Sequence, residues 1–260
     1  MMRFIHDIVK YRRYMVYSAK AQLKNEVAGS FLNRLWWILD PLLFMLVYTF
    51  VYSIVFGRSQ DYLCAFIFLG YSSWEFFNRS VKQSVKLVKK YKSVLSKVYL
   101  PKFVLIISTM MVNGFKMLIS FGIIIITMAL YRIPPSLTML WVFPFLLLLF
   151  LLTFGFSCWL LHFGVFFEDL ANVVNVALRL MFYMSGIFYN PEQQLTDIVR
   201  YCMVRLNPTC SIITQLRNTI LYAQNPLWHW LILWAIVGLI ISASGIALIY
   251  HYERRYVKTI

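Results

Sequence analysis

Long apolar stretches separated by short polar connections constrain this sequence more than any other feature. Six of them lie at residues 35–56, 62–81, 103–130, 137–167, 173–189 and 227–250. A helix needs about 20 apolar residues to cross a bilayer, because it rises about 1.5 Å per residue. Charged residues make up only 13% of the chain, whereas a soluble domain has roughly a quarter. We therefore expect an all-α membrane protein, with six transmembrane helices in one domain at 35–250.

Lysine and arginine gather in three segments, which predicts the orientation of these spans. Residues 1–34, 79–102 and the tail 251–260 are basic, and the positive-inside rule places such segments in the cytoplasm. Both termini are then cytoplasmic. Membrane lipids with anionic headgroups explain the net charge of +15, so we expect no nucleic-acid partner. The basic residues before residue 35 leave no apolar run, and we expect no cleavable signal peptide.

The segment 79–102 has the spacing of an amphipathic helix on the membrane surface. Val81, Val85 and Val88 line one helical face. The lysines around them are expected to face water or lipid headgroups: Lys82, Lys86, Lys89, Lys90, Lys92, Lys97 and Lys102. A positive-inside signal alone would explain their charge, whereas docking of a partner protein would also explain the amphipathic pattern.

Two further segments are expected to lie at the membrane interface rather than across it. Residues 1–34 predict an interfacial helix whose apolar face holds Ile8, Met15, Ala19 and Leu23. The outer loop 190–225 contains two apolar pieces, 198–204 and 211–221, that are too short to span and predict re-entrant or interfacial helices. The spacing of Cys202 and Cys210 favours two free thiols over a disulfide.

Besides Asp40 and Arg79 near the ends of two spans, three charged residues fall inside the predicted spans: Glu75, Lys116 and Arg179. A charge at the bilayer centre costs about 2.5–3.5 kcal/mol on insertion scales, so each needs a partner or water. Glu75 and Arg179 lie at similar depth, which predicts either a pair or a shared water-filled cavity, or else separate snorkelling to the headgroups. Lys116 is expected to face a lumen or a subunit interface.

Other side chains permit both a functional and a structural interpretation. Tyr48, Tyr52 and Phe56 form an aromatic stripe on one helix. Such rings suit sugars, but ordinary packing or an aromatic belt explains the same pattern. His162 and Asp169 are seven residues apart and share a helix face. No second ligand cluster stands nearby, so a structural histidine is favoured and no metal is expected.

Several motifs occur in order along nearly the whole chain. They are GSFLNRLWWILDPLL at 29–43, KVYLPK at 97–102, FEDL at 167–170, SGIFY at 185–189 and NP at 207–208. Together they resemble the permease subunit of ABC-2 type exporters of polysaccharides, the family that exports O-antigen, capsule and teichoic acid chains. The chain departs from the usual pattern at Asn33, Leu100, Glu168 and Gly186.

The resemblance implies a homodimeric pore in a bacterial cell membrane, paired with two copies of a separate ATPase that binds ATP and Mg²⁺. The chain has no phosphate-binding loop ending in Lys-Ser/Thr, so we expect no cofactor and no enzymatic activity in it. The residues implied to couple to the ATPase are Lys82, Lys86, Lys89, Lys90 and Lys97. Those implied to stack on sugars in the channel are Tyr48, Tyr52, Phe56, Tyr183 and Tyr189. A lipid-linked pyrophosphate would contact Arg12, Arg13, Lys24 or Arg34.

Three alternatives compete with a polysaccharide exporter. An exporter of the same fold that moves a lipid or a drug would have a closed cavity open to lipid instead of a wide aromatic pore. A membrane-embedded glycosyl or acyl transferase would need His162, Glu168 and Asp169 to converge on one cavity. A scaffold without transport would not explain the charges inside the spans.

Overall fold

The protein is described by a computed structural model at residues 2–28, 32, 35–55, 61–194, 196–253 and 255–256. The described residues contain helices and no strand, which confirms the all-α class. The long helices are α1 (Met2–Val27), α2 (Trp36–Val55), α3 (Leu63–Val85), α6 (Lys102–Leu130), α7 (Val142–Phe166), α8 (Leu170–Met184) and α12 (Trp228–His251). The shorter ones are α4 (Leu87–Lys90), α5 (Lys92–Leu95), η2 (Leu137–Trp141), α9 (Pro191–Gln194), α10 (Asp197–Tyr201), η3 (Cys202–Leu206) and α11 (Pro208–Ile220).

Four of the described helical segments are long and apolar enough to cross a membrane. They are α2, α6, α7 together with the 3-10 turn η2, and α12. The other two predicted spans correspond to α3, which carries Glu75, Arg79 and Lys82, and to α8, which has only 15 residues. The total of six spans therefore stays a prediction.

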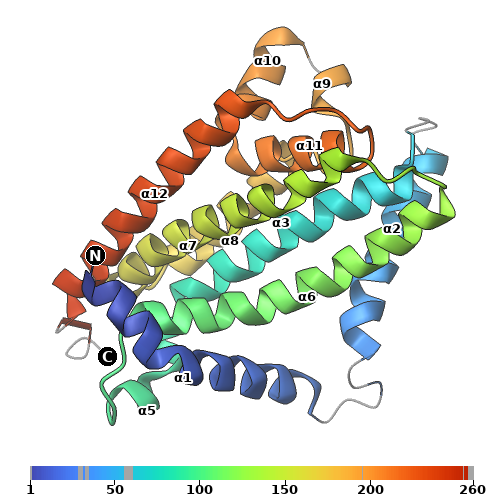
Figure 1. Cartoon of the computed structure of the whole chain (residues 1–260). Helices are drawn as coiled ribbons and strands as arrows, with labels where there is room; N and C mark the ends of the chain where they lie inside the picture. The colour runs from blue at the N-terminus through green and yellow to red at the C-terminus, as the bar shows by residue number, and fades with distance from the viewer. Residues whose placement is uncertain are drawn as a thin grey trace.

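Helix α3 is the centre of the bundle. It packs against α2, α6, α7, α8 and α11, and large side chains such as Phe66, Phe68, Trp74 and Phe77 are buried along it. Figure 1 shows α1 and α5 at one end of the bundle and α9, α10 and α11 at the other. We call the first of these the basic end, because it carries the segment 79–102.

The segment 79–102 is not one continuous amphipathic helix, so that prediction was wrong. Helix α3 continues to Val85, and α4 and α5 follow as single turns interrupted at Lys86 and Tyr91. Because of these breaks, α4 and α5 can each orient apolar side chains toward the bundle independently of the other. Val81, Val85 and Val88 are buried, as their spacing predicted.

One lysine of this segment departs from the expected exposure. Lys102 is buried in the first turn of α6, and its ammonium lies 5.8 Å from the centre of the Tyr99 ring. The other lysines, including Lys89 and Lys97, are exposed. A long aliphatic stem tolerates burial when the charged head has an aromatic face beside it.

Helix α1 has the predicted amphipathic face, with Met15 and Ala19 buried. Its first turn is tied to both the basic segment and the end of the chain. The Arg3 guanidinium donates to the Tyr99 hydroxyl at 2.8 Å, and that hydroxyl donates to Glu253 at 2.6 Å. Burial, and then the nearby Glu253 carboxylate, raise the pKa of Tyr99 to about 12, so the hydroxyl keeps its proton at neutral pH.

The predicted fourth span, 137–167, consists of the 3-10 turn η2 followed by α7, and the predicted fifth span ends earlier than expected. Pro144 lies in the first turn of α7, where its missing N–H costs little, so it does not interrupt the helix. The predicted fifth span ended at Tyr189, but α8 ends at Met184. Gly186 follows with φ of +65°, a backbone conformation that ends a helix and that side chains disfavour.

Helix α11 is built into the bundle rather than lying on its surface. The Asn207 side chain caps it by accepting from the backbone N–H groups of Thr209 and Cys210, and Pro208 starts it. Most of α11 is buried, including Arg217, which lies in the predicted outer loop 190–225. The Arg217 guanidinium donates to the carbonyls of Phe66 at 3.0 Å, Gly186 at 2.6 Å and Ile187 at 2.8 Å.

Helices α7 and α12 approach each other through small residues. A Cβ placed on Gly245 of α12 would lie 2.7 Å from the Cβ of Cys158 in α7. The Trp159 indole N–H also crosses this contact, donating to the Ile241 carbonyl at 3.2 Å and to Ser244 at 3.1 Å. Small residues at such contacts let two membrane helices pack closely.

Replacing Arg217 with methionine should destabilise the fold strongly, because three buried carbonyls lose their donors. We expect a loss of at least about 3 kcal/mol, seen as a lower thermal unfolding midpoint and a poor yield of folded protein in detergent. Arg179→Met is the matched control, because Arg179 is exposed, and it should change stability by less than about 0.5 kcal/mol. Equal stability of the two variants would contradict the anchoring role of Arg217.

Replacing Gly245 with alanine should force α7 and α12 apart, at a cost of about 1–3 kcal/mol. Gly122→Ala in α6 is the control, because a Cβ there has no heavy atom within 4 Å. The control should be neutral or slightly stabilising, since alanine favours a helix. Thermal unfolding of both variants in the same detergent checks this, and a stable Gly245→Ala protein would refute the close contact.

Candidate functional site

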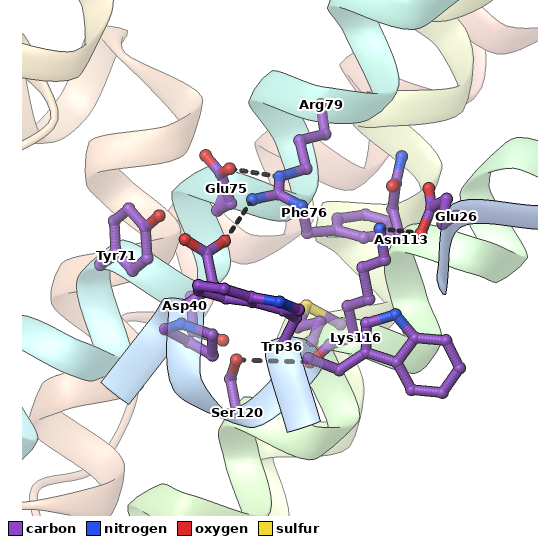
Figure 2. Close-up of a pocket in the computed structure, with 14 residues that line it drawn as sticks. Glu26, Trp36, Asp40, Tyr71, Glu75, Phe76, Arg79, Asn113, Lys116 and Ser120 are labelled. Carbon is purple, nitrogen blue, oxygen red and sulfur yellow. Dashed lines mark hydrogen bonds and ion pairs between the residues drawn. The ribbon is translucent and has the colours of Figure 1, made fainter. Parts of the chain in front are cut away.

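A cavity of about 390 Å³ lies between α1, α2, α3 and α6, on the side of the bundle where α2 begins. Its charged lining residues are Glu26, Asp40, Glu75, Arg79 and Lys116, and its aromatic ones are Trp36, Trp37, Tyr71 and Phe76. Figure 2 shows these charged side chains in two groups, with Glu75 and Asp40 directed toward Arg79, and Lys116 directed toward Glu26. We call it the charged pocket.

Arg79 joins α3 to α2 at this pocket. It forms an ion pair with Glu75, one turn earlier on the same helix, and a second pair with Asp40 of α2 at 3.0 Å. The Glu75 carboxylate also accepts from the Asn78 amide at 3.2 Å. Asp40 therefore serves as a partner for Arg79 rather than only as a charge near the start of α2.

Lys116 joins α6 to α1 on the opposite wall. Its ammonium lies 2.6 Å from the Glu26 carboxylate near the end of α1. Lys116 thus faces the pocket rather than lipid, in line with the expected lumen or interface.

The structure does not bring Glu75 and Arg179 together, as one interpretation of the sequence proposed. Glu75 pairs with Arg79, whereas Arg179 is exposed and does not line the pocket. The spacing of Glu75 and Arg79, four residues apart on one helix, was a signal for the observed pair that the sequence analysis missed.

Three buried polar atoms of pocket residues have no hydrogen-bond partner among the described residues. They are the Trp37 indole nitrogen, the Ser72 hydroxyl and the amide oxygen of Asn113. The Asn113 amide nitrogen is satisfied, since it donates to Ser80 at 3.0 Å and to Gln83 at 3.1 Å. Buried polar groups without partners are rare, and in a cavity they indicate a polar occupant.

A second, larger cavity of about 740 Å³ adjoins the charged pocket at the basic end. The two share Glu26 and Arg79 in their linings. The other charged residues of the second cavity are Lys82, Lys86 and Lys90. We call it the basic groove, and its excess of positive charge suits an anionic group at a membrane surface.

Three of the four cations predicted to meet a lipid-linked pyrophosphate line neither cavity. Arg12, Arg13 and Lys24 are exposed on α1, and Arg34 lies outside the described residues. The cations that the structure gathers around the two cavities come instead from α3, α4 and α6.

The predicted sugar-stacking residues have differing surroundings. Tyr48 stacks on Phe188 with ring centres 4.5 Å apart, Tyr52 is buried, and the Tyr189 hydroxyl donates to the Tyr183 carbonyl at 2.9 Å. Tyr183 has its ring exposed, and Phe56 lies outside the described residues. Their role with sugars stays a prediction.

The lysines predicted to couple to an ATPase divide into two groups. Lys82, Lys86 and Lys90 line the basic groove, whereas Lys89 and Lys97 point elsewhere and are exposed. Lys89 forms an ion pair with Glu168 at 2.8 Å, which links α4 to the turn between α7 and α8. The hydrogen bond from Lys89, and then its charge, lower the pKa of Glu168.

His162 has a structural environment. Its Nδ1 lies 2.6 Å from the Tyr256 hydroxyl, and its ring packs against Phe166 and Tyr252. Neither cavity is lined by His162, Glu168 or Asp169, and the described residues contain no cluster suited to a metal. The convergence that a transferase requires is therefore not found in the described part of the chain.

Comparison with known proteins gives a consistent group of relatives. Residues 15–221 match the family described as ABC-2 type transporter. The chain is 25% identical over 249 residues to an O-antigen export system permease protein, RfbA, of Klebsiella pneumoniae, covering 94% of this chain and 93% of that protein. A second protein of that name from the same species is 26% identical over 249 residues, with the same coverage of both chains. One from Myxococcus xanthus is 28% identical over 215 residues, 82% of each chain.

The Lys89–Glu168 ion pair should depend on pH. Because the pKa of Glu168 lies below its ordinary value of 4.5, the pair is intact above that value and is lost as pH falls through the lowered one. Spin labels at Ser93 and Asn172 should report a wider distance distribution at the low pH. Glu168→Gln should show the wide distribution at every pH, and a distribution that never changes would contradict the link.

Proposed function

The chain belongs to the ABC-2 type transporter family, and we propose that it is the permease subunit of an ATP-driven exporter of a lipid-linked polysaccharide. The observation that carries the proposal is that three relatives, each named an O-antigen export permease, align with 82% to 94% of the chain. The apolar helices and the charges between them support a path through a membrane.

The proposed assembly contains two copies of this chain and two copies of a separate ATPase. The exposed lysines of the basic end, with Lys89 and Lys97 directed away from the groove, offer a surface for the ATPase. This surface contacts the rest of the bundle through the Lys89–Glu168 pair. In this arrangement both termini are cytoplasmic and the complex lies in a bacterial cell membrane.

The charged pocket and the basic groove suit the entry of a lipid-linked substrate. A lipid carrier brings its phosphate groups to the level of the headgroups, where the groove presents Lys82, Lys86 and Lys90. The glycan would then pass along α2 and α8, with Tyr48, Tyr52, Tyr183 and Tyr189 as contacts for sugar rings. An exporter that moves a free lipid or a drug is the competing function, and the test below separates it.

A strain that lacks this gene should lose its surface polysaccharide and accumulate the lipid-linked glycan on the cytoplasmic face. The intact gene should restore export, and it should fail to do so with an ATPase subunit that cannot hydrolyse ATP. A strain that keeps its surface glycan but accumulates another lipid or a drug would reject the polysaccharide and favour the competing exporter.

Replacing both Lys89 and Lys97 with glutamine should weaken binding of the ATPase. Two surface charge pairs at about 0.5 kcal/mol each correspond to roughly a fivefold loss of affinity, measured by co-purification at low salt. Arg132→Gln, at the opposite end of the bundle, is the control and should retain full binding. Equal recovery of the ATPase with both proteins would remove this surface as its docking site.

A further inference from the structure

We propose that Arg79 and Lys116 bind the phosphate oxygens of the substrate, and that Asp40 and Glu26 occupy these cations until the phosphate displaces them. The inference deepens the function proposed above and rests on it. The ligand chemistry is a phosphate or diphosphate ester on a lipid. The two displaced carboxylates belong to α2 and to the C-terminal end of α1, so the same exchange would release α2 and that end of α1.

The charges of the pocket require an exchange rather than a simple addition. Among the described residues, its lining contains three carboxylates and two cations, which sum to one net negative charge. A diphosphate added to this set would meet repulsion in a site of reduced dielectric. With Asp40 and Glu26 withdrawn, Glu75 remains against two cations, and the pocket becomes net positive.

The exposure of the carboxylates identifies which of them leave. The Asp40 side chain is 59% exposed and the Glu26 side chain 38%, whereas Glu75 is 23% exposed. Asp40 and Glu26 can therefore return to water or headgroups at little cost in desolvation. Glu75 is held within α3 by Arg79 and Asn78, and it keeps the Arg79 side chain in place.

The partnerless polar atoms are a second and independent sign of a ligand. Ser72 and Asn113 are 3% and 2% exposed, and each has a polar atom without a partner among the described residues. The Ser72 hydroxyl and the Trp37 indole N–H are buried donors that would meet phosphate oxygens once α2 moves and exposes them. The Asn113 amide oxygen accepts, which suits a sugar hydroxyl beside the phosphate.

The basic groove supplies the route to this site. It shares Arg79 and Glu26 with the charged pocket, so an anion held by its lysines lies next to both exchange positions. Glu26 stands at the boundary of the two cavities, and its release from Lys116 would remove the negative charge from the path. The positive charge of Lys82, Lys86 and Lys90 would attract the phosphate first.

Displacement of Asp40 would loosen the helix that is least anchored. Of the four candidate spans, α2 has the smallest buried share, 11% against 22% to 33% for the others. Its other contacts near this level include two ring pairs: Phe44 stacks on Tyr71 with centres 3.5 Å apart, and Trp37 meets Phe115 at 5.6 Å. Substrate binding would thus be linked to movement of α2 away from α3.

The test compares neutralised cations with neutralised carboxylates in the full chain, purified in phosphatidylcholine nanodiscs. Arg79→Gln and Lys116→Gln should each weaken binding of a polyprenyl diphosphate at least about tenfold. Asp40→Asn and Glu26→Gln should strengthen it, about threefold to tenfold, because the competitor is gone. Arg179→Gln and Asp197→Asn, which lie outside both cavities, are the controls and should leave the affinity unchanged.

Exchange predicts opposite effects on affinity: neutralising a cation weakens binding of the ligand, and neutralising a carboxylate strengthens it. If the ion pairs only hold the helices together, all four pocket variants would weaken binding, and the proposal fails. Titration with phosphatidylglycerol and with inorganic diphosphate separates the sources: a site for the substrate prefers the polyprenyl diphosphate, and a preference for phosphatidylglycerol would assign it to a resident lipid and overturn the substrate role. Binding is measured on purified protein, whereas export is measured in cells. A failure of the exchange proposal is therefore distinguishable from a failure of the proposed export function.

Discussion

The guanidinium of Arg79 is shared between Glu75 on its own helix and Asp40 on α2, and it joins α2 to the central helix of the bundle. A charge at this position needs partners, because an isolated one inside a bilayer is costly. Glu75 lies on the same helix as Arg79, which fixes its position. Asp40 on α2 is more exposed, and a ligand can replace it. The same interaction therefore gives a half-buried cation its partners and leaves one helix free to move.

The remainder of the bundle is held by interactions of another kind. The Arg217 guanidinium of α11 donates to three backbone carbonyls, and Gly245 lets α12 lie against α7. These contacts are buried and leave no side chain that an incoming ligand could replace. We infer that α3, α6, α7, α11 and α12 form the rigid part, against which α2 and the C-terminal end of α1 move.

The location of the basic groove connects this movement to the proposed motor. Lys82, Lys86 and Lys90 face the groove, whereas Lys89 pairs with Glu168 on the turn before α8. One short segment thus touches the substrate route on one side and the α7–α8 turn on the other. The interruptions at Lys86 and Tyr91 make this division possible, because a continuous helix would present its lysines on a single broad face.

The sequence predicted what depends on periodicity and length. The sixth span was placed within one residue of α12, and the buried face of Val81, Val85 and Val88 was correct, since both follow from local pattern. Pairings across helices were not predicted, because nothing local specifies that Asp40 meets Arg79 or that Glu26 meets Lys116. The burial of Arg217 was missed for the same reason: its partners are carbonyls, which every residue carries and which no sequence pattern marks.

Movement of α2 on ligand binding is the most direct test of the account. Spin labels at Ile38 and Met111 report the separation of α2 and α6 near the pocket, and labels at Val51 and Ile126 report it toward their other ends. On addition of a polyprenyl diphosphate in nanodiscs, we predict that the first distance increases while the second stays nearly constant. Binding of the ligand with both distances unchanged would contradict the account.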